Sequence, residues 1–149
     1  LSGADSPAKI AQAILQIFPE FPIPENCPEP VLGKGSNYNW KATKVDLAHY
    51  LELLHKQRIL DTALDSMGKN LQGRTTSFQL SRQAAMVGKI AFPIANDIPL
   101  GGVITVSLTS DDLGDWLEAA TWHSGRDRMP RSIGDEKTMA EDGEAATWV

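Results

Sequence analysis

The stretch TSFQLSRQAAMVGK (residues 76–89) decides the fold, because it passes from strand spacing to helical spacing without a loop between them. Apolar and polar side chains alternate over residues 75–80, which is typical of a half-buried strand. Ser81 follows as a candidate helix N-cap, and Gly88 ends a short helical turn. The stretch therefore predicts a strand that leads directly into a helix.

Outward from this stretch, apolar periodicity and capping residues predict the other elements. Helices are expected over residues 7–18, 43–67 and 110–120, and strands at 31–32, 89–92 and 103–108. In the last strand Ile104, Val106 and Leu108 are expected to face the core. The apolar stripe of the long helix changes phase near His55–Arg58, so this helix either bends there or is buried on two sides. Mixed helices and strands in this order predict an α+β fold.

Length and composition favour one soluble domain with a tail. The chain has 149 residues and a net charge of −5, and after residue 122 it loses its apolar period. We expect a single domain over residues 1–122 and a mobile, charged tail over residues 123–149. No apolar run is long enough to cross a membrane, no secretory signal is visible, and Cys27 alone cannot form an internal disulfide. A reducing, cytoplasmic compartment is therefore the expected location.

Positive charge is concentrated in the middle of the chain. Residues 30–96 carry nine Lys and Arg against four Asp and Glu, whereas residues 1–29 carry one against four. Residues 97–149 carry four against eleven. If folding brings the central bases together, they would form a basic face on an acidic protein, which favours a polyanionic partner.

Three stretches together resemble a known family. They are QRILDTA (residues 57–63), TSFQLSRQAAMVGK (residues 76–89) and PLG (residues 99–101) followed by a strand. Their order and spacing are similar to an archaeal family of uncharacterised proteins to which RNA binding has been ascribed, over residues 6–122. The resemblance implies a fold like ribosomal protein L-five, with an antiparallel sheet covered by helices on one face, and a homodimer. In that family a strand precedes the first helix, and we expect it to be shortened or absent here.

The candidate RNA-binding residues come from the basic middle of the chain and from the resembling stretches. Aromatic rings stack on bases, lysine and arginine neutralise phosphates, and amides reach base edges. The set comprises Lys34, Tyr38, Trp40, Lys41, Lys56, Arg58, Arg74, Arg82, Gln83 and Lys89.

Several of these residues have a structural alternative. Trp40 can pack beneath the following helix, with Tyr38 beside it, and Arg58 can form an ion pair with Asp61 on one helix face. For Arg82 the two interpretations are equally weighted.

Other motifs point to no chemistry. Residues 33–36 lack the spacing of a phosphate-binding loop, and His49 and His55 lie on different helix faces, which argues against a metal pair. Asp61 and Asp65 are expected to be part of a solvated helix face. No nucleophile motif is present, so no catalytic residue, cofactor, metal or small-molecule substrate is expected.

The sequence thus predicts a non-enzymatic RNA-binding protein that works as a dimer. The alternative is a dimeric module for structure or protein interaction, in which any contact with RNA is incidental. Dispersed bases and an exposed apolar patch would favour this alternative.

Overall fold

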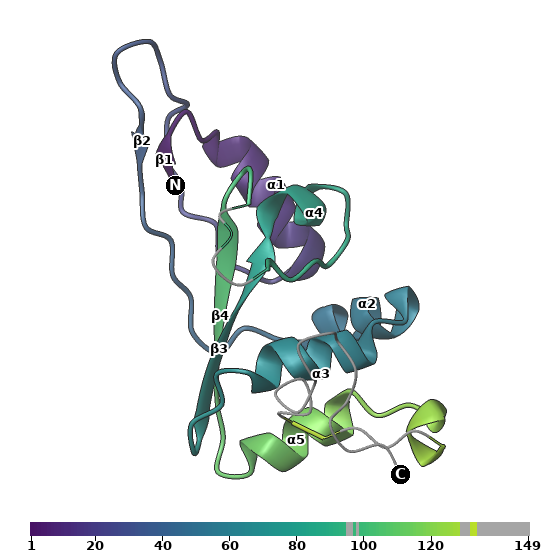
Figure 1. Cartoon of the computed structure of the whole chain (residues 1–149). Coiled ribbons are helices and arrows are strands. Elements are labelled where there is room, and N and C mark those ends of the chain that lie inside the picture. The colour runs from purple at the N-terminus through teal and green to yellow at the C-terminus, as the bar shows by residue number, and fades with distance from the viewer. Residues whose placement is uncertain (95–96, 98, 129–131, 134–149) are drawn as a thin grey trace. The chain divides into compact units, whose positions relative to one another are not determined.

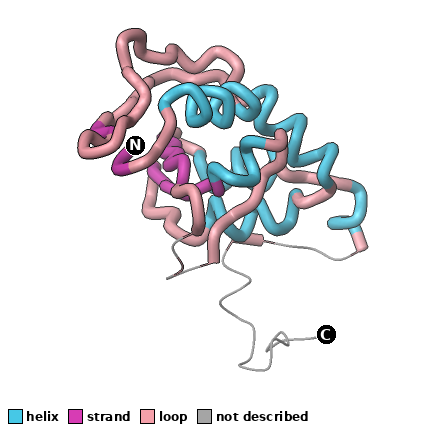
Figure 2. The backbone as a smooth tube through the Cα atoms, turned by 90° about the horizontal axis from the view of Figure 1, so that it is seen from above, coloured by secondary structure: helices cyan, strands magenta, loops and turns pink. Residues whose placement is uncertain are grey.

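The computed structural model describes residues 1–94, 97, 99–128, 132 and 133 (Figures 1 and 2). The elements in chain order are β1 (Ser2–Gly3), α1 (Pro7–Ile17), β2 (Ser36–Asn37), α2 (Ala48–Gln57), α3 (Leu60–Gly68), β3 (Thr75–Ser81), α4 (Arg82–Met86), β4 (Val103–Thr109), α5 (Leu113–Ala120) and the 3-10 helix η1 (Ser124–Asp127). The chain divides into two compact units. Unit 1 comprises residues 1–57 and 79–104, and unit 2 comprises residues 58–78 and 105–149.

The strands form two separate two-stranded sheets, so the α+β class is confirmed while the single predicted sheet is not found in the described residues. β1 pairs antiparallel with β2, and Ser2 lies opposite Asn37. β3 pairs with β4, as Figure 1 shows. The amide of Ser110 bonds the Arg74 carbonyl beyond one end of the pair, and the amide of Arg82 bonds the Gly102 carbonyl at the other. The start of β3 thus lies beside the end of β4, and the end of β3 lies beside the start of β4. The two strands are therefore antiparallel.

Helix α1 begins where the sequence predicts, because two side chains satisfy its first amides. The Ser6 hydroxyl accepts from Lys9 N, and the Glu29 carboxylate accepts from Ala8 N at 3.1 Å. The hydrogen bonds from Ser6 and Ala8 lower the pKa of Glu29 below its ordinary value. Pro7 at the first helical position loses no needed hydrogen bond. Ser6 and Pro7 are local signals for this helix start, and Glu29 adds a contact from 21 residues further along the chain.

The core of unit 1 lies between α1, α2 and α4. Ile14 and Ile17 of α1 are buried, and Phe18 stacks on Tyr50 of α2 with ring centroids 6.0 Å apart. Burial raises the pKa of Tyr50 far above its ordinary value. Ala85 of α4 is 1% exposed, consistent with the packing of α4 on α1. These contacts confirm the apolar stripe predicted for the first helix.

The long helix predicted over residues 43–67 is two helices. α2 starts at Ala48, whose amide donates to the Asp46 carboxylate at 2.8 Å, and not at Thr43. The helix stops because Arg58 has φ +57°, in the left-handed region that terminates an α-helix. The phase change in the apolar stripe therefore marks a break between two helices, whereas the sequence predicted either a bend or burial on two sides.

Strand β3 has the predicted alternation, and Thr76, Phe78 and Leu80 are each at most 4% exposed. In unit 2 the Thr76 hydroxyl donates to the Met67 carbonyl at 2.6 Å, which ties the strand to the end of α3. β4 also alternates as predicted, although Ile104, Val106 and Leu108 are only half-buried. Unit 2 buries Leu64 of α3 and Leu117 of α5. The helix α3–α5 pair supplies the apolar core of this unit.

The strand predicted at residues 89–92 does not form. Lys89 N bonds the Ala84 carbonyl, Ile90 N bonds the Gln57 side chain, and the Ala91 carbonyl accepts from Ser81 N. Each backbone group thus bonds a different element, so no continuous ladder is built. The segment at 31–32 is likewise a tight turn, closed by a bridge between Val31 and Lys34.

Substituting Arg58→Gly should raise the free energy of unfolding by about 0.5–1 kcal/mol. A residue with a β-carbon is destabilised by roughly 1–2 kcal/mol in the left-handed region, whereas glycine is not. Glycine also has more conformational entropy in the unfolded chain, which offsets part of this gain. Urea denaturation followed by circular dichroism measures the change. Lys56→Gly, inside α2, is the matched control and should destabilise by about 1 kcal/mol. A loss of stability in Arg58→Gly would contradict the role given to the backbone at this position.

Candidate nucleic-acid interface

The segment of residues 30–45 in unit 1 carries Lys34, Lys41 and Lys44 and no Asp or Glu. It contains a turn and the short strand β2 but no helix, and all three lysines are exposed. Among the described residues, no carboxylate lies within 4.0 Å of any of these ammonium groups. The segment therefore presents three unneutralised cations along one stretch of backbone.

Two aromatic residues lie within this segment, and the structure treats them differently. The Tyr38 side chain is half-buried, and its hydroxyl donates to the Pro28 carbonyl at 3.4 Å. Its backbone is bound at both groups, because Tyr38 N donates to the Leu1 carbonyl and Tyr38 O accepts from the Leu1 amino group. The Trp40 indole N–H is buried without a partner among the described residues. The N–H edge of the Trp40 ring is thus turned inward, which favours the packing alternative, although both aromatic residues are half-buried.

A second pair of lysines is brought together by Gln57. The Gln57 amide donates to the Ile90 carbonyl at 3.1 Å and accepts from Ile90 N at 2.8 Å. Lys56 precedes Gln57 and Lys89 precedes Ile90 in the sequence. The two hydrogen bonds between Gln57 and Ile90 therefore place both lysines in the same part of unit 1. Both lysines are exposed, and neither has a carboxylate within 4.0 Å in the described part of the chain.

Arg82, one of the predicted RNA contacts, is instead a structural anchor. Its Nε donates to the Val103 carbonyl at 2.8 Å, and its Nη1 donates to Asp5 at 3.3 Å. The side chain is 19% exposed. A guanidinium with these partners has little capacity left for a phosphate. Gln83, the next residue, is exposed.

The two remaining predicted residues, Arg58 and Arg74, belong to unit 2. Arg74 forms an ion pair with Asp111, and Arg58 is exposed but does not form the predicted pair with Asp61. The predicted set is thus divided between the two units. The cations of the set without a carboxylate within 4.0 Å among the described residues are Lys34, Lys41, Lys56 and Lys89 of unit 1 and Arg58 of unit 2.

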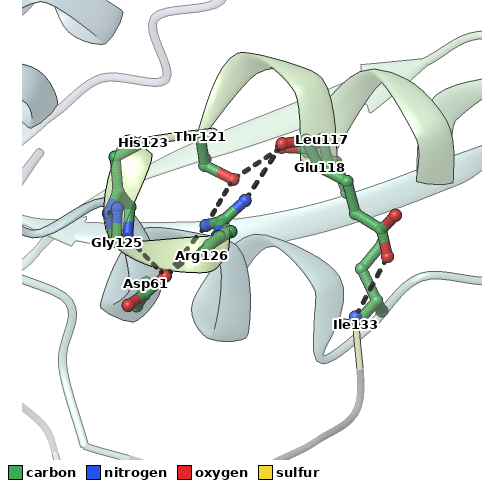
Figure 3. A network of polar contacts seen from close by, with 8 residues as sticks. All are labelled: Asp61, Leu117, Glu118, Thr121, His123, Gly125, Arg126 and Ile133. Atoms are coloured by element: carbon green, nitrogen blue, oxygen red, sulfur yellow. Dashed lines mark hydrogen bonds and ion pairs between the residues drawn. The ribbon is translucent and has the colours of Figure 1, made fainter. Parts of the chain in front are cut away.

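Asp61 lies at the centre of a polar network that sequence reasoning missed (Figure 3). Its Oδ1 accepts from His123 Nε2 and from Arg126 Nε, both at 3.0 Å. Arg126 is 7% exposed and also donates to the Glu118 carbonyl and the Thr121 hydroxyl, each at 3.0 Å. All donor nitrogens of this guanidinium therefore have partners. The predicted tail is wrong at its start, because residues 123–128 fold onto unit 2; residues 129–131 and 134–149 lie outside the described residues.

The hydrogen bonds also set the protonation of this network. His123 Nδ1 accepts from Gly125 N at 3.2 Å, so the ring proton is on Nε2, where it donates to Asp61. Burial raises the pKa of Asp61, but the hydrogen bonds from His123 and Arg126 and the charge of Arg126 outweigh this effect and hold the pKa below its ordinary 3.8. His123 and Arg126 both lie more than sixty residues from Asp61 in the chain. Local sequence patterns do not predict contacts over such separations.

The described residues contain no group of three or more His, Cys, Asp or Glu side chains arranged to hold a metal ion. A search of the same residues finds no helix with the length and apolar character that a membrane crossing requires.

Comparisons with known proteins identify relatives over most of the chain, although no family model matches it. The chain is 33% identical over 118 residues to the UPF0201 protein of Methanothermobacter thermautotrophicus, covering 77% of this chain and 83% of that protein. It is 38% identical over 117 residues to the UPF0201 protein of Sulfurisphaera tokodaii, covering 76% and 78% respectively. The crystal structure of the UPF0201 protein from Methanococcus jannaschii is similar with a TM-score of 0.62 at 25% identity, over 80% of this chain and 92% of that one. The predicted resemblance to an archaeal family of uncharacterised proteins is thereby confirmed.

Substituting Asp61→Asn should lower the free energy of unfolding by about 1–3 kcal/mol at neutral pH, because the buried Arg126 loses its charged partner. Since the pKa of Asp61 is lowered in the folded state, its contribution is complete above 3.8 and is lost as the pH falls through the folded value. Urea denaturation of both proteins over a pH series measures the gap. Asp112→Asn, at an exposed position without a side-chain capping bond, is the control and should leave stability unchanged. A gap of the same size well below pH 3.8 would contradict the assignment.

Proposed function

The chain belongs to the UPF0201 family, and we propose that it is a non-enzymatic RNA-binding protein that holds single-stranded RNA against unit 1. The contacts are phosphate neutralisation by Lys34, Lys41 and Lys44, extended by Lys56 and Lys89. Tyr38 adds stacking. Trp40, Arg74 and Arg82 are left out of this interface, because their polar groups are buried or already bound within the protein.

The observation that carries the proposal is the acid-free lysine segment of residues 30–45. A folded protein usually surrounds exposed lysines with carboxylates, and unit 1 as a whole carries equal numbers of acidic and basic residues. Three lysines without a carboxylate, with a half-buried tyrosine among them, match two needs of single-stranded nucleic acid: spaced cations for its phosphates and a ring on which a base can stack.

The geometry of the acid–histidine pair supports the non-enzymatic part of the proposal. Asp61 and His123 form the arrangement that a general base would use. However, His123 Nδ1 accepts from Gly125 N and Nε2 donates to Asp61, so neither ring nitrogen is open to a substrate. The network serves to hold residues 121–126 in place.

The salt dependence of binding to single-stranded RNA tests the proposal. If all five lysines contact phosphates, the plot of log K against log salt should have a slope of about −3.5, at roughly −0.7 for each phosphate. The variant with Lys34, Lys41 and Lys44 all replaced by Ala should reduce that slope by about 2. Fluorescence anisotropy with a labelled uridine 20-mer at several salt concentrations measures both.

Arg74→Ala is the matched control, because this cation is already paired with Asp111 and its removal should leave the slope unchanged. Equal losses in the triple lysine variant and in Arg74→Ala would point to nonspecific charge attraction. Absence of binding at low salt would reject the proposal.

A second candidate function, self-association or protein interaction, is favoured by apolar side chains exposed on unit 1. Val87, Ile94 and Leu100 are 72–81% exposed. Leu100 and Met86 also line a hollow of about 210 Å³ together with Ile10 and the stems of Lys9 and Arg82. Apolar surface of this kind is typical of an interface with a second copy or another protein.

Light scattering during gel filtration separates the two candidates. If a second copy covers this surface, Leu100→Asp should convert a dimer to a monomer, because the introduced carboxylate would be desolvated without a partner. The triple lysine variant should keep its mass. A monomeric wild-type protein would remove self-association and leave the RNA proposal standing.

A further inference from the structure

Two glycines of unit 2 form a notch that a side chain from further along the sequence fills. Gly68 is the last residue of α3 and is buried, and Gly114 lies in the first turn of α5. A β-carbon at position 68 would lie only 2.7 Å from Cγ2 of Ile133, closer than two carbons approach. A β-carbon at position 114 would lie 3.8 Å from Cδ1 of Ile133 and 3.6 Å from Leu71. The isoleucine thus sits where a side chain at position 68 would be.

The backbone does not require glycine at position 68. Its φ is not among the positive values, which in this chain fall on other glycines. Alanine is favoured over glycine in a helix by about 1 kcal/mol. Neither backbone geometry nor helix propensity thus explains the glycine at position 68. The space that Ile133 occupies does explain it.

Ile133 is also held through its backbone, because its amide donates to the Glu118 carboxylate at 3.4 Å (Figure 3). Glu118 belongs to α5, and its own carbonyl accepts from Arg126. The chain after α5 is therefore attached to the α3–α5 pair at two places: first through the Asp61 network and again at Ile133. Between them lies the exposed Arg128.

We propose that Ile133 is an intramolecular latch, and that the notch formed by Gly68 and Gly114 is its docking site on unit 2. The notch selects a single aliphatic side chain, because Gly68 removes the atoms that would collide with it. With Ile133 docked, the chain after α5 is attached to the α3–α5 pair both through the Asp61 network and at Ile133, and with Ile133 undocked only the Asp61 network remains. Gly68 is the residue that decides whether the latch can close.

Limited proteolysis of the full chain tests the latch. A protease needs a stretch of chain that can extend into its active site, so the rate of trypsin cleavage after Arg128 should follow the population in which Ile133 is undocked. Gly68→Ala should speed this cleavage by roughly tenfold or more, because the new methyl group expels Ile133. Ile133→Ala should speed it similarly, since the latch then has no side chain to dock. Mass spectrometry identifies the cleavage site, and circular dichroism confirms that each variant is folded.

The double variant gives the decisive comparison. In the Ile133→Ala background, Gly68→Ala should cause no further acceleration, because there is nothing left to expel. Thr62→Ala, at an exposed position of α3 outside the notch, is the control and should cleave like the wild type. The proposal is overturned if Gly68→Ala is silent or is equally disruptive without Ile133. If Gly68→Ala does not fold, unchanged cleavage in Ile133→Ala alone overturns it.

Discussion

The passage from strand β3 to helix α4 is the constraint on which unit 1 depends. At this point the Ser81 amide donates to the Ala91 carbonyl, and the Ser81 hydroxyl accepts from Ala84 N. The next residue, Arg82, bonds Gly102 through its backbone and Val103 through its side chain. These bonds fix the end of β3, the start of α4 and the entry to β4 at once.

Glycine is needed opposite this junction. Gly102 has φ +82°, and a β-carbon there would lie 3.0 Å from Nη1 of Arg82. A residue with a side chain at position 102 would therefore be destabilised by the positive φ. It would also push the Arg82 guanidinium away from Asp5 and Val103. The arginine in the fold-deciding stretch is thus explained by architecture, without reference to any ligand.

Local signals in the sequence were sufficient for most elements. Ser6 followed by Pro7, the alternation in β3 and the Ser81 cap each involve residues close in sequence, and each element forms where predicted. The failures are of another kind. The segment at 89–92 has strand-like residues, but its hydrogen-bond partners are a helix end, a glutamine side chain and a strand end, which no local pattern reveals.

The same distinction explains the candidate site. The lysine segment could be read directly, because an acid-free run is a property of neighbouring residues. The partners of Arg82 and Asp61 could not, since Asp5 lies 77 positions from the first, and His123 and Arg126 lie 62 and 65 from the second. A count of charges from composition therefore includes side chains that long-range ion pairs bind within the protein and that are not free to contact a ligand.

The division of labour between arginine and lysine in this chain has a physical basis. A guanidinium presents five donors in a rigid plane, so it can satisfy several carbonyls and a carboxylate together when it is taken out of water. Arg82 and Arg126 are used in this way, and both are largely buried. An ammonium group on a flexible stem is strongly hydrated and costs more to bury, so Lys34, Lys41 and Lys44 stay in solvent. A count of positive charges therefore overstates the surface available to a polyanion wherever arginines contribute to it, and in this protein the lysines are the better guide.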